Sequence, residues 1–254
     1  MDLAGEAKPI VRFEFWISEN DDLTSNSIVA VHGLCGSRSA TWVADTGVNW
    51  LPDLLPLRIP TARVLIYGYD STAHSSQHIV QKILFSRARK LIANLDTLRR
   101  ETHSEQRPII FTGHSLGGIL IKSALIQSEW AKLGEEKNLY AIKQSTIGIV
   151  FFGTPHHGTS TNSWRQLLEN VVAASNPKFP AFEFLAKDSE WLEMQTEQYK
   201  SISRHLSNYY CYETRNAPSL CFSAPVRHVV VTGDRLDANT YRSTDRASAF
   251  GLPF

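Results

Sequence analysis

The sequence predicts an α/β protein in which a mostly parallel central sheet is covered by helices on both faces. Short apolar runs rich in β-branched residues alternate along the chain with longer segments of helical periodicity. One of the short runs, at residues 108–112, leads directly into a glycine-flanked serine and then into an apolar helical segment. Neither a repeat nor a linker interrupts the chain, so residues 1–254 are expected to form a single domain.

The strands are expected where short apolar runs are bounded by polar turns. The first segment alternates and is typical of an edge strand, whereas the later ones are continuously apolar and are typical of buried strands. The expected strands cover residues 11–17, 28–31, 62–67, 108–112, 147–152, 209–212 and 228–232.

Four segments are expected to be helical. The clearest covers residues 79–100, where apolar residues recur at spacings of three and four. Its basic residues, such as Arg87 and Arg89, are interpreted as a solvated face in preference to a lipid-binding face. The other expected helices cover residues 50–55, 116–130 and 182–205.

The composition excludes several function classes. Lys plus Arg number 26 and Asp plus Glu number 25, and this balance gives no overall charge that would attract nucleic acid. Three scattered cysteines, Cys35, Cys211 and Cys221, form neither a disulfide framework nor a zinc motif, so we expect reduced thiols, no metal and no cofactor. No signal peptide is visible, and no apolar run approaches the ~20 residues of a transmembrane helix, so any membrane contact is expected to be peripheral.

The residues Gly113-His114-Ser115-Leu116-Gly117 match the G-x-S-x-G pattern of a nucleophile elbow. Their position between an apolar strand and a helix is the context that this motif requires, and it predicts the α/β-hydrolase fold with Ser115 as the nucleophile. Glycine at the flanking positions avoids collisions with the neighbouring strand and helix. The alternative is a helix-capping serine in an ordinary tight turn.

Two backbone N–H groups are expected to bind the oxyanion that forms during ester cleavage. One belongs to Leu116 at the start of the helix, and the other to Leu34 or Cys35 in the loop that His32-Gly33 opens. His32 is expected to support this loop. The alternative is an ordinary turn at the end of a strand.

Four blocks of sequence together resemble the serine-active-site-containing lipase-like family: AVHGLCGS, ARVLIYGYDS, RPIIFTGHSLGG and GIVFFGTPHHG. Relatives of that family include the inositol deacylases of lipid anchors and the N-terminal hydrolase domains of NACHT-type receptors. The resemblance covers residues 28–213. It implies esterase or lipase chemistry on a lipid or acyl ester, and an intracellular location at mitochondrial or endoplasmic-reticulum membranes, with the cytoplasm as the alternative.

Three histidines near the predicted site have proposed supporting roles. In the resemblance, His156 and His157 shape the pocket; we favour the alternative that they tie down a loop, because adjacent histidines lack metal-ligand spacing. His114 is expected to point away from Ser115.

The acid and the base of a catalytic triad should follow the last two strands, in the order serine, acid, histidine. Glu213 ends the next-to-last strand and is the candidate acid, with an ordinary surface glutamate as the alternative. Thr240 stands where the resemblance implies the histidine. His228 begins the last strand, and in a parallel sheet that start lies at the amino edge, about 13 Å from the catalytic edge.

Two functional hypotheses follow. The first is a serine ester hydrolase that uses Ser115. The second is a catalytically impaired hydrolase-fold binding or signalling module, or a fragment of a larger receptor. Residues 221–254 depart from the family pattern, as a truncated or mis-spliced product would. We expect this tail to be less ordered than the sheet, ester turnover to be slow, and Thr240→His to raise it.

Overall fold

The computed structural model describes residues 10–12, 15–17, 26–34, 36–71, 77–134, 136–156, 189–213 and 229–233. Its centre is a sheet whose eight described strands have the order β1-β2-β4-β3-β5-β6-β7-β8. The five inner strands, from β4 to β7 in this order, run parallel. The strands are β1 (Ile10–Arg12), β2 (Phe15–Ile17), β3 (Ser27–Val31), β4 (Arg63–Tyr67), β5 (Ile109–His114), β6 (Thr146–Phe152), β7 (Ser207–Glu213) and β8 (Val229–Gly233).

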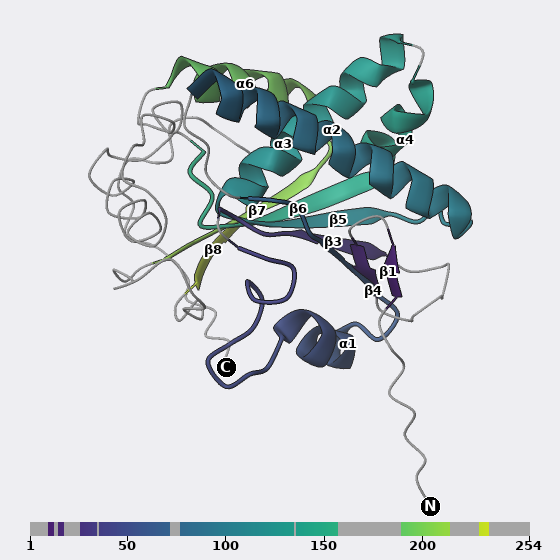
Figure 1. Cartoon of the computed structure of the whole chain (residues 1–254), viewed down its shortest axis with the longest axis vertical. Helices are drawn as coiled ribbons and strands as arrows, with labels where there is room; N and C mark the ends of the chain where they lie inside the picture. The colour runs from purple at the N-terminus through teal and green to yellow at the C-terminus, as the bar shows by residue number, and fades with distance from the viewer. Residues whose placement is uncertain are drawn as a thin grey trace, which may run out of the picture.

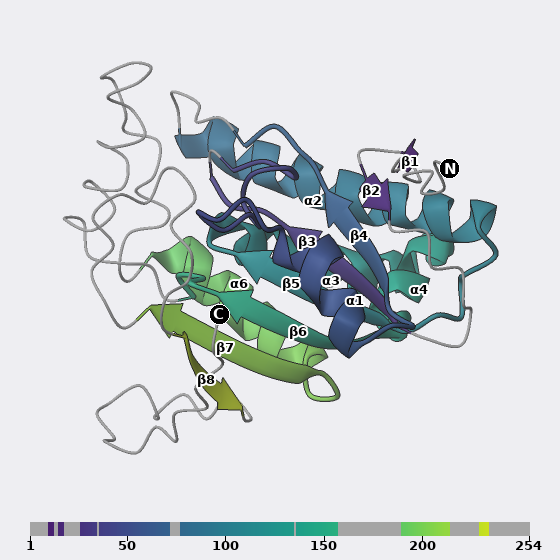
Figure 2. The same cartoon turned by 90° about the horizontal axis from the view of Figure 1, so that it is seen from below.

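Helices cover both faces of this sheet, as the sequence predicts, but unequally (Figure 1). Four described α-helices lie on one face, and α1 lies on the other with the π-helical turn that precedes it. Figure 2 views the molecule from the side of α1, with the parallel strands side by side behind it. The helices are α1 (Leu55–Arg58), α2 (Gln77–Glu101), α3 (Leu116–Trp130), α4 (Lys137–Ser145) and α6 (Glu190–Ile202); the π-helical turn η1 covers Trp50–Leu54 and the short 3-10 turn η2 covers Ala131–Leu133.

Most expected elements are confirmed. The helix at residues 116–130 has the bounds expected for it, and the helix at 79–100 extends slightly in both directions to form α2. Of the helix expected at 182–205, α6 confirms the central part, while residues 182–188 lie outside the described ranges. The sequence analysis missed α4, in which Leu139 and Ile142 are buried against the α2–α3 pair.

The expected single edge strand at residues 11–17 is wrong. Two short antiparallel strands replace it, with Ile10 opposite Ile17 and Arg12 opposite Phe15. Alternation of side chains is the same in one long strand as in two short ones, so the periodicity could not reveal the reversal of the chain. Of these two strands, β2 pairs with the inner strand β4, where Phe15 is fully buried against the ring of Tyr67.

The expectation that the last strand runs parallel is also wrong. Strand β8 runs antiparallel to β7, with Val229 opposite Glu213 and Gly233 opposite Tyr209. Because β7 is parallel to β5, β8 begins at the carboxyl edge of the parallel strands and ends near the amino edge. The argument that placed His228 at the amino edge therefore fails, although His228 itself lies outside the described residues.

Among the described helices, α3 is the most deeply buried, and it contains an unusual core residue. Thirteen of its residues are buried, from Leu116 to Ser128, between the sheet and its neighbours α2, α4 and α6. One of them is Lys122, whose ammonium lies 5.3 Å from the centre of the Tyr199 ring. Burial lowers the pKa of Lys122 to about 7, because the charged ammonium is poorly solvated there.

Candidate active site

Ser115 lies in the turn between β5 and α3, at the carboxyl edge of the parallel strands. Its φ is 51° and its ψ is −121°, a conformation that side chains other than glycine rarely adopt. Such a residue costs of order 1–3 kcal/mol and persists only where its surroundings hold it. Here the Ser115 N–H donates to the carbonyl of Phe152 at 2.8 Å, and the Gly118 N–H donates to the Ser115 carbonyl at 3.1 Å.

The glycines on both sides of Ser115 allow this turn to form. A Cβ on Gly117 would lie 2.2 Å from the carbonyl oxygen of Val31 and 2.5 Å from that of His32. A Cβ on Gly113 would lie 2.7 Å from the Cα of Gly118. The helix therefore starts in direct contact with β3 and β5, as the elbow motif predicts.

The loop after β3 lies against the nucleophile candidate. A Cβ on Gly33 would lie 2.9 Å from the Cβ of Ser115, so the two backbones approach as closely as a glycine allows. Leu34 follows in this loop, half-buried, and Cys35 lies outside the described residues. Leu116 is the first residue of α3, where backbone N–H groups have no partner within the helix. The oxyanion roles of Leu34, Cys35 and Leu116 remain predictions.

His32 is fully buried at the start of this loop, and its ring nitrogens are occupied by backbone groups. Its Nε2 accepts from the Tyr69 N–H at 3.3 Å, so its Nδ1 carries the proton and donates to the Gly33 carbonyl at 3.0 Å. Burial lowers the pKa of His32, which keeps the ring neutral in this role. The imidazole thus links the loop to the backbone at Tyr69.

Tyr69, which the sequence analysis did not single out, holds the same loop from the end of β4. Its ring stacks on His32 with centres 4.3 Å apart, and its hydroxyl donates to the His32 carbonyl at 2.9 Å. The Arg87 guanidinium lies over this ring, 5.6 Å from its centre, and pairs with Asp70 at 3.4 Å. Nothing in a lone tyrosine after a strand would have revealed this contact before the fold was known.

His114 contacts the aromatic residues on the α1 side of the sheet. Its ring lies edge-to-face with Trp42, with ring centres 6.5 Å apart. Trp42 in turn lies edge-to-face with Trp50, with ring centres 6.1 Å apart. Trp50 also contacts Phe152, the residue whose carbonyl holds the Ser115 N–H. Burial lowers the pKa of His114 to about 4, so the ring is neutral at neutral pH.

His156 lies in the loop after β6, and its side chain packs among aromatic rings. Its ring packs edge-to-face against two aromatic rings, with ring centres 4.7 Å from Phe151 and 5.0 Å from Tyr210. Its carbonyl accepts from the Thr196 hydroxyl of α6 at 3.3 Å. The imidazole is therefore committed to the layer between the sheet and α6; His157 lies outside the described residues.

The acid and base candidates are only partly described. Glu213 ends β7 at the carboxyl edge, two strands from β5, which corresponds to about 10 Å of lateral separation. Its side chain, His228 and Thr240 lie outside what the structure describes.

The described residues contain no group of three or more His, Cys, Asp or Glu side chains arranged to hold a metal ion. Of the cysteines, Cys211 is described; it is free and buried, and burial raises the pKa of its thiol to about 11. In the part of the chain that the structure covers, no helix combines the length and the apolar character needed to cross a membrane.

No protein-family model matches the sequence. The curated proteins that it resembles include Protein SERAC1 of Danio rerio, 28% identical over 200 residues that cover 70% of this chain and 28% of the relative. Protein SERAC1 of Mus musculus is 24% identical over 224 residues, covering 80% of this chain and 32% of the relative. The chain thus matches less than a third of the length of these relatives, and its relation to inositol deacylases and NACHT-type receptors remains a prediction.

Solved structures with similar architecture include a lipase and a phospholipase. The mature form of the Bacillus licheniformis lipase BlEst2 superposes with a TM-score of 0.54 at 18% identity, covering 82% of this chain and 75% of the lipase. Phospholipase PlaB from Legionella pneumophila gives a TM-score of 0.50 at 13% identity, covering 76% of this chain and 39% of the phospholipase. At these identities the likeness establishes the architecture alone, and that architecture is the α/β-hydrolase fold.

Proposed function

We propose that this chain is a serine hydrolase of the lipase and esterase type that cleaves a lipid or acyl ester through Ser115. The observation that carries the proposal is the positive φ of Ser115, held between two glycines at the exit of a buried parallel strand. A serine in an ordinary helix-capping turn has no need of this strain. The resemblance of the sequence blocks to the lipase-like family supports a lipid or acyl ester as the substrate.

In the proposed reaction, the Ser115 hydroxyl attacks the ester carbonyl and loses its proton to an imidazole. Backbone N–H groups of Leu116 and of Leu34 or Cys35 stabilise the oxyanion of the tetrahedral intermediate. The imidazole then protonates the departing alcohol, and water hydrolyses the acyl-enzyme. Glu213 is the proposed carboxylate partner of the imidazole.

The direction of β8 changes the choice of base. Strand β8 begins at the carboxyl edge with Val229, which pairs with Glu213. His228 directly precedes Val229 in the sequence. Strand β8 ends near the amino edge at Gly233, and position 240 comes later in the sequence. We therefore propose His228 as the base to test first. Its strand lies three strand spacings from β5, roughly 14 Å, so the segment before Val229 must cover most of that separation.

A second candidate function is a hydrolase-fold binding or signalling module without efficient catalysis. It is favoured by Thr240, which occupies the position where the family resemblance implies the histidine. Loss of the triad histidine from a serine hydrolase lowers turnover about a million-fold. The two functions therefore differ by an effect that a simple assay can measure.

The deciding experiment measures fluorophosphonate labelling and p-nitrophenyl ester turnover of the purified chain and three variants. We expect Ser115→Ala to abolish both signals, His228→Gln to lower turnover at least 100-fold, and Thr240→His to leave it unchanged. Turnover that persists in Ser115→Ala would refute the nucleophile. Slow turnover of the unmodified chain that rises in Thr240→His would instead support the impaired module and restore position 240 as the base site.

We further propose an intracellular location with peripheral contact to mitochondrial or endoplasmic-reticulum membranes, and the cytoplasm as the alternative. The support is the resemblance of the sequence blocks to the lipase-like family and the proposed lipid or acyl-ester substrate. Fractionation of cells that express the tagged chain tests this, with release from membranes by high salt or carbonate as the expected result. Recovery only in the cytosolic fraction would favour the alternative.

A further inference from the structure

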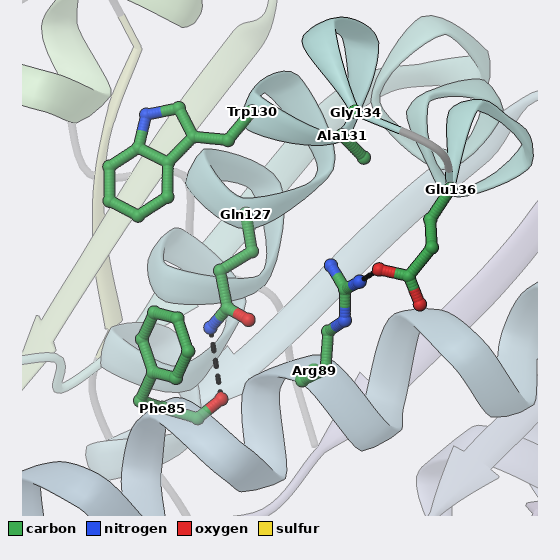
Figure 3. Close-up of a pocket in the computed structure, with 7 residues that line it drawn as sticks. All are labelled: Phe85, Arg89, Gln127, Trp130, Ala131, Gly134 and Glu136. Atoms are coloured by element: carbon green, nitrogen blue, oxygen red, sulfur yellow. Dashed lines mark hydrogen bonds and ion pairs between the residues drawn. The ribbon is translucent and has the colours of Figure 1, made fainter.

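A pocket of about 430 Å³ opens between α2, α3 and the turn that follows α3 (Figure 3). Its walls are mainly apolar and include Phe85, Trp130 and Ala131, and Gln127 forms part of the lining. Gln127 lies eleven residues after the start of α3, about 16 Å along the helix from the Ser115 turn. The pocket is therefore separate from the candidate active site.

The feature that indicates a ligand is the side-chain amide of Gln127, which is only 3% exposed. Its Nε2 donates to the backbone carbonyl of Phe85 at 2.9 Å. A carbonyl can only accept, so this bond fixes which end of the amide faces α2. The Oε1 is left buried with no hydrogen-bond partner in the structure and is directed toward the space beside Arg89 and Glu136 (Figure 3).

Two aromatic rings line the same pocket, on the side of the Gln127 amide away from Arg89 (Figure 3). Phe85 is 53% exposed and Trp130 is 51% exposed, which is high for large apolar side chains. On the side toward which Oε1 is directed, Arg89 pairs with Glu136. Since these two charges compensate each other, the pocket offers an acceptor and apolar surface without a net charge.

We propose that this pocket binds a small, uncharged aromatic molecule that carries an N–H or O–H donor, such as an indole or a phenol. The donor satisfies Gln127 Oε1, and the ring covers Phe85 and Trp130. The volume suits a compact ligand, because small-molecule pockets typically occupy about 300–1,000 Å³. A purely apolar ligand would leave the buried oxygen without a partner, and this requirement gives the pocket its selectivity.

The test compares indole with benzofuran, which has nearly the same shape but no donor. Binding is measured by titration of the full ¹⁵N-labelled chain. We expect indole to shift amide signals of α2 and α3 around Phe85 and Gln127, and to bind about tenfold more tightly than benzofuran. Trp130→Ala should weaken indole binding. Met194→Ala, a residue of α6 that is 52% exposed and does not line the pocket, serves as the matched control and should leave it unchanged.

Gln127→Met identifies the acceptor, since methionine has a similar length and lacks the amide. In that variant indole and benzofuran should bind equally. If the variant does not fold, the comparison of the two probes in the unmodified chain and in Trp130→Ala still decides. Equal binding of both probes to the unmodified chain, full binding in Trp130→Ala, or no binding of indole at millimolar concentration would each overturn the proposal. None of these readouts depends on ester hydrolysis.

Discussion

Replacement of Gly117 by alanine tests whether the contact between α3 and β3 sets the geometry of the nucleophile. The new Cβ would meet the carbonyl oxygen of Val31 at 2.2 Å, whereas ordinary contacts begin at 3.4 Å. The second clashing atom is the carbonyl oxygen of His32, at 2.5 Å. Because both are backbone atoms, neither can rotate out of the way. The start of α3 must therefore move away from the sheet by about 1 Å, on the order of the missing separation.

Two consequences follow from that displacement. Overpacking of this kind costs about 1–3 kcal/mol, which in a chain of this size lowers the Tm by roughly 2–12 °C. Misplacement of reacting groups by about 1 Å lowers turnover about 100-fold. Thermal unfolding and the rate of fluorophosphonate labelling at Ser115 measure the two effects on the same sample.

Gly134→Ala is the matched control. A Cβ at this position would meet its nearest neighbour only at 4.0 Å, and the backbone there is extended. We expect its Tm and its labelling rate to equal those of the unmodified chain. If Gly117→Ala behaves like Gly134→Ala, the close packing of α3 against β3 does not position Ser115, and the reasoning fails.

Three further predictions concern buried polar groups. Tyr69→Phe removes the hydroxyl that donates to the His32 carbonyl and should lower the free energy of unfolding by about 1 kcal/mol in chemical denaturation, with an unchanged value counting against the loop-holding role. Lys122→Met should raise the free energy of unfolding most below pH 7, because the buried lysine is charged there. This gain in stability should shrink as the pH rises toward 10.5, and a gain that does not depend on pH would contradict the prediction. His32 and His114 have lowered pKa values in the folded state, so the unfolded state binds protons first and stability should fall as the pH drops from about 6.5 toward 4; a flat profile in urea denaturation would contradict it.

The parallel centre of the sheet could be predicted because strands buried on both faces are continuously apolar and the turn after residue 112 has a specific motif. The bounds of α3 followed from the same motif, which fixes the start of the helix at Leu116. Strand direction at the two edges could not be predicted. A short apolar run such as residues 228–232 has the same composition whichever way it pairs, and its direction depends on the partner strand.

In the candidate site, too, some residues could be predicted from local sequence patterns and others could not. Ser115 and the two glycines beside it are recognisable because the local chain geometry demands those residue types. Tyr69 supports the loop at His32 from 37 residues further along the chain, and no local pattern encodes a contact of that kind. The base is harder still, since its position depends on the direction of β8.

The three glycines around Ser115 are so tightly packed that their retention during evolution would not show whether the chain is an active enzyme. A Cβ on Gly118 would lie 2.1 Å from the Thr154 hydroxyl oxygen, and those on Gly113 and Gly117 would overlap backbone atoms. Selection for a folded core alone would therefore retain glycine at all three positions, even in a descendant that had lost Ser115. Glycines that persist at these positions are explained by the close packing of the helix against the sheet. An imidazole near the serine, by contrast, is under selection only while the chain catalyses. A mutational scan read out by protein abundance and again by ester turnover would separate these two kinds of constraint.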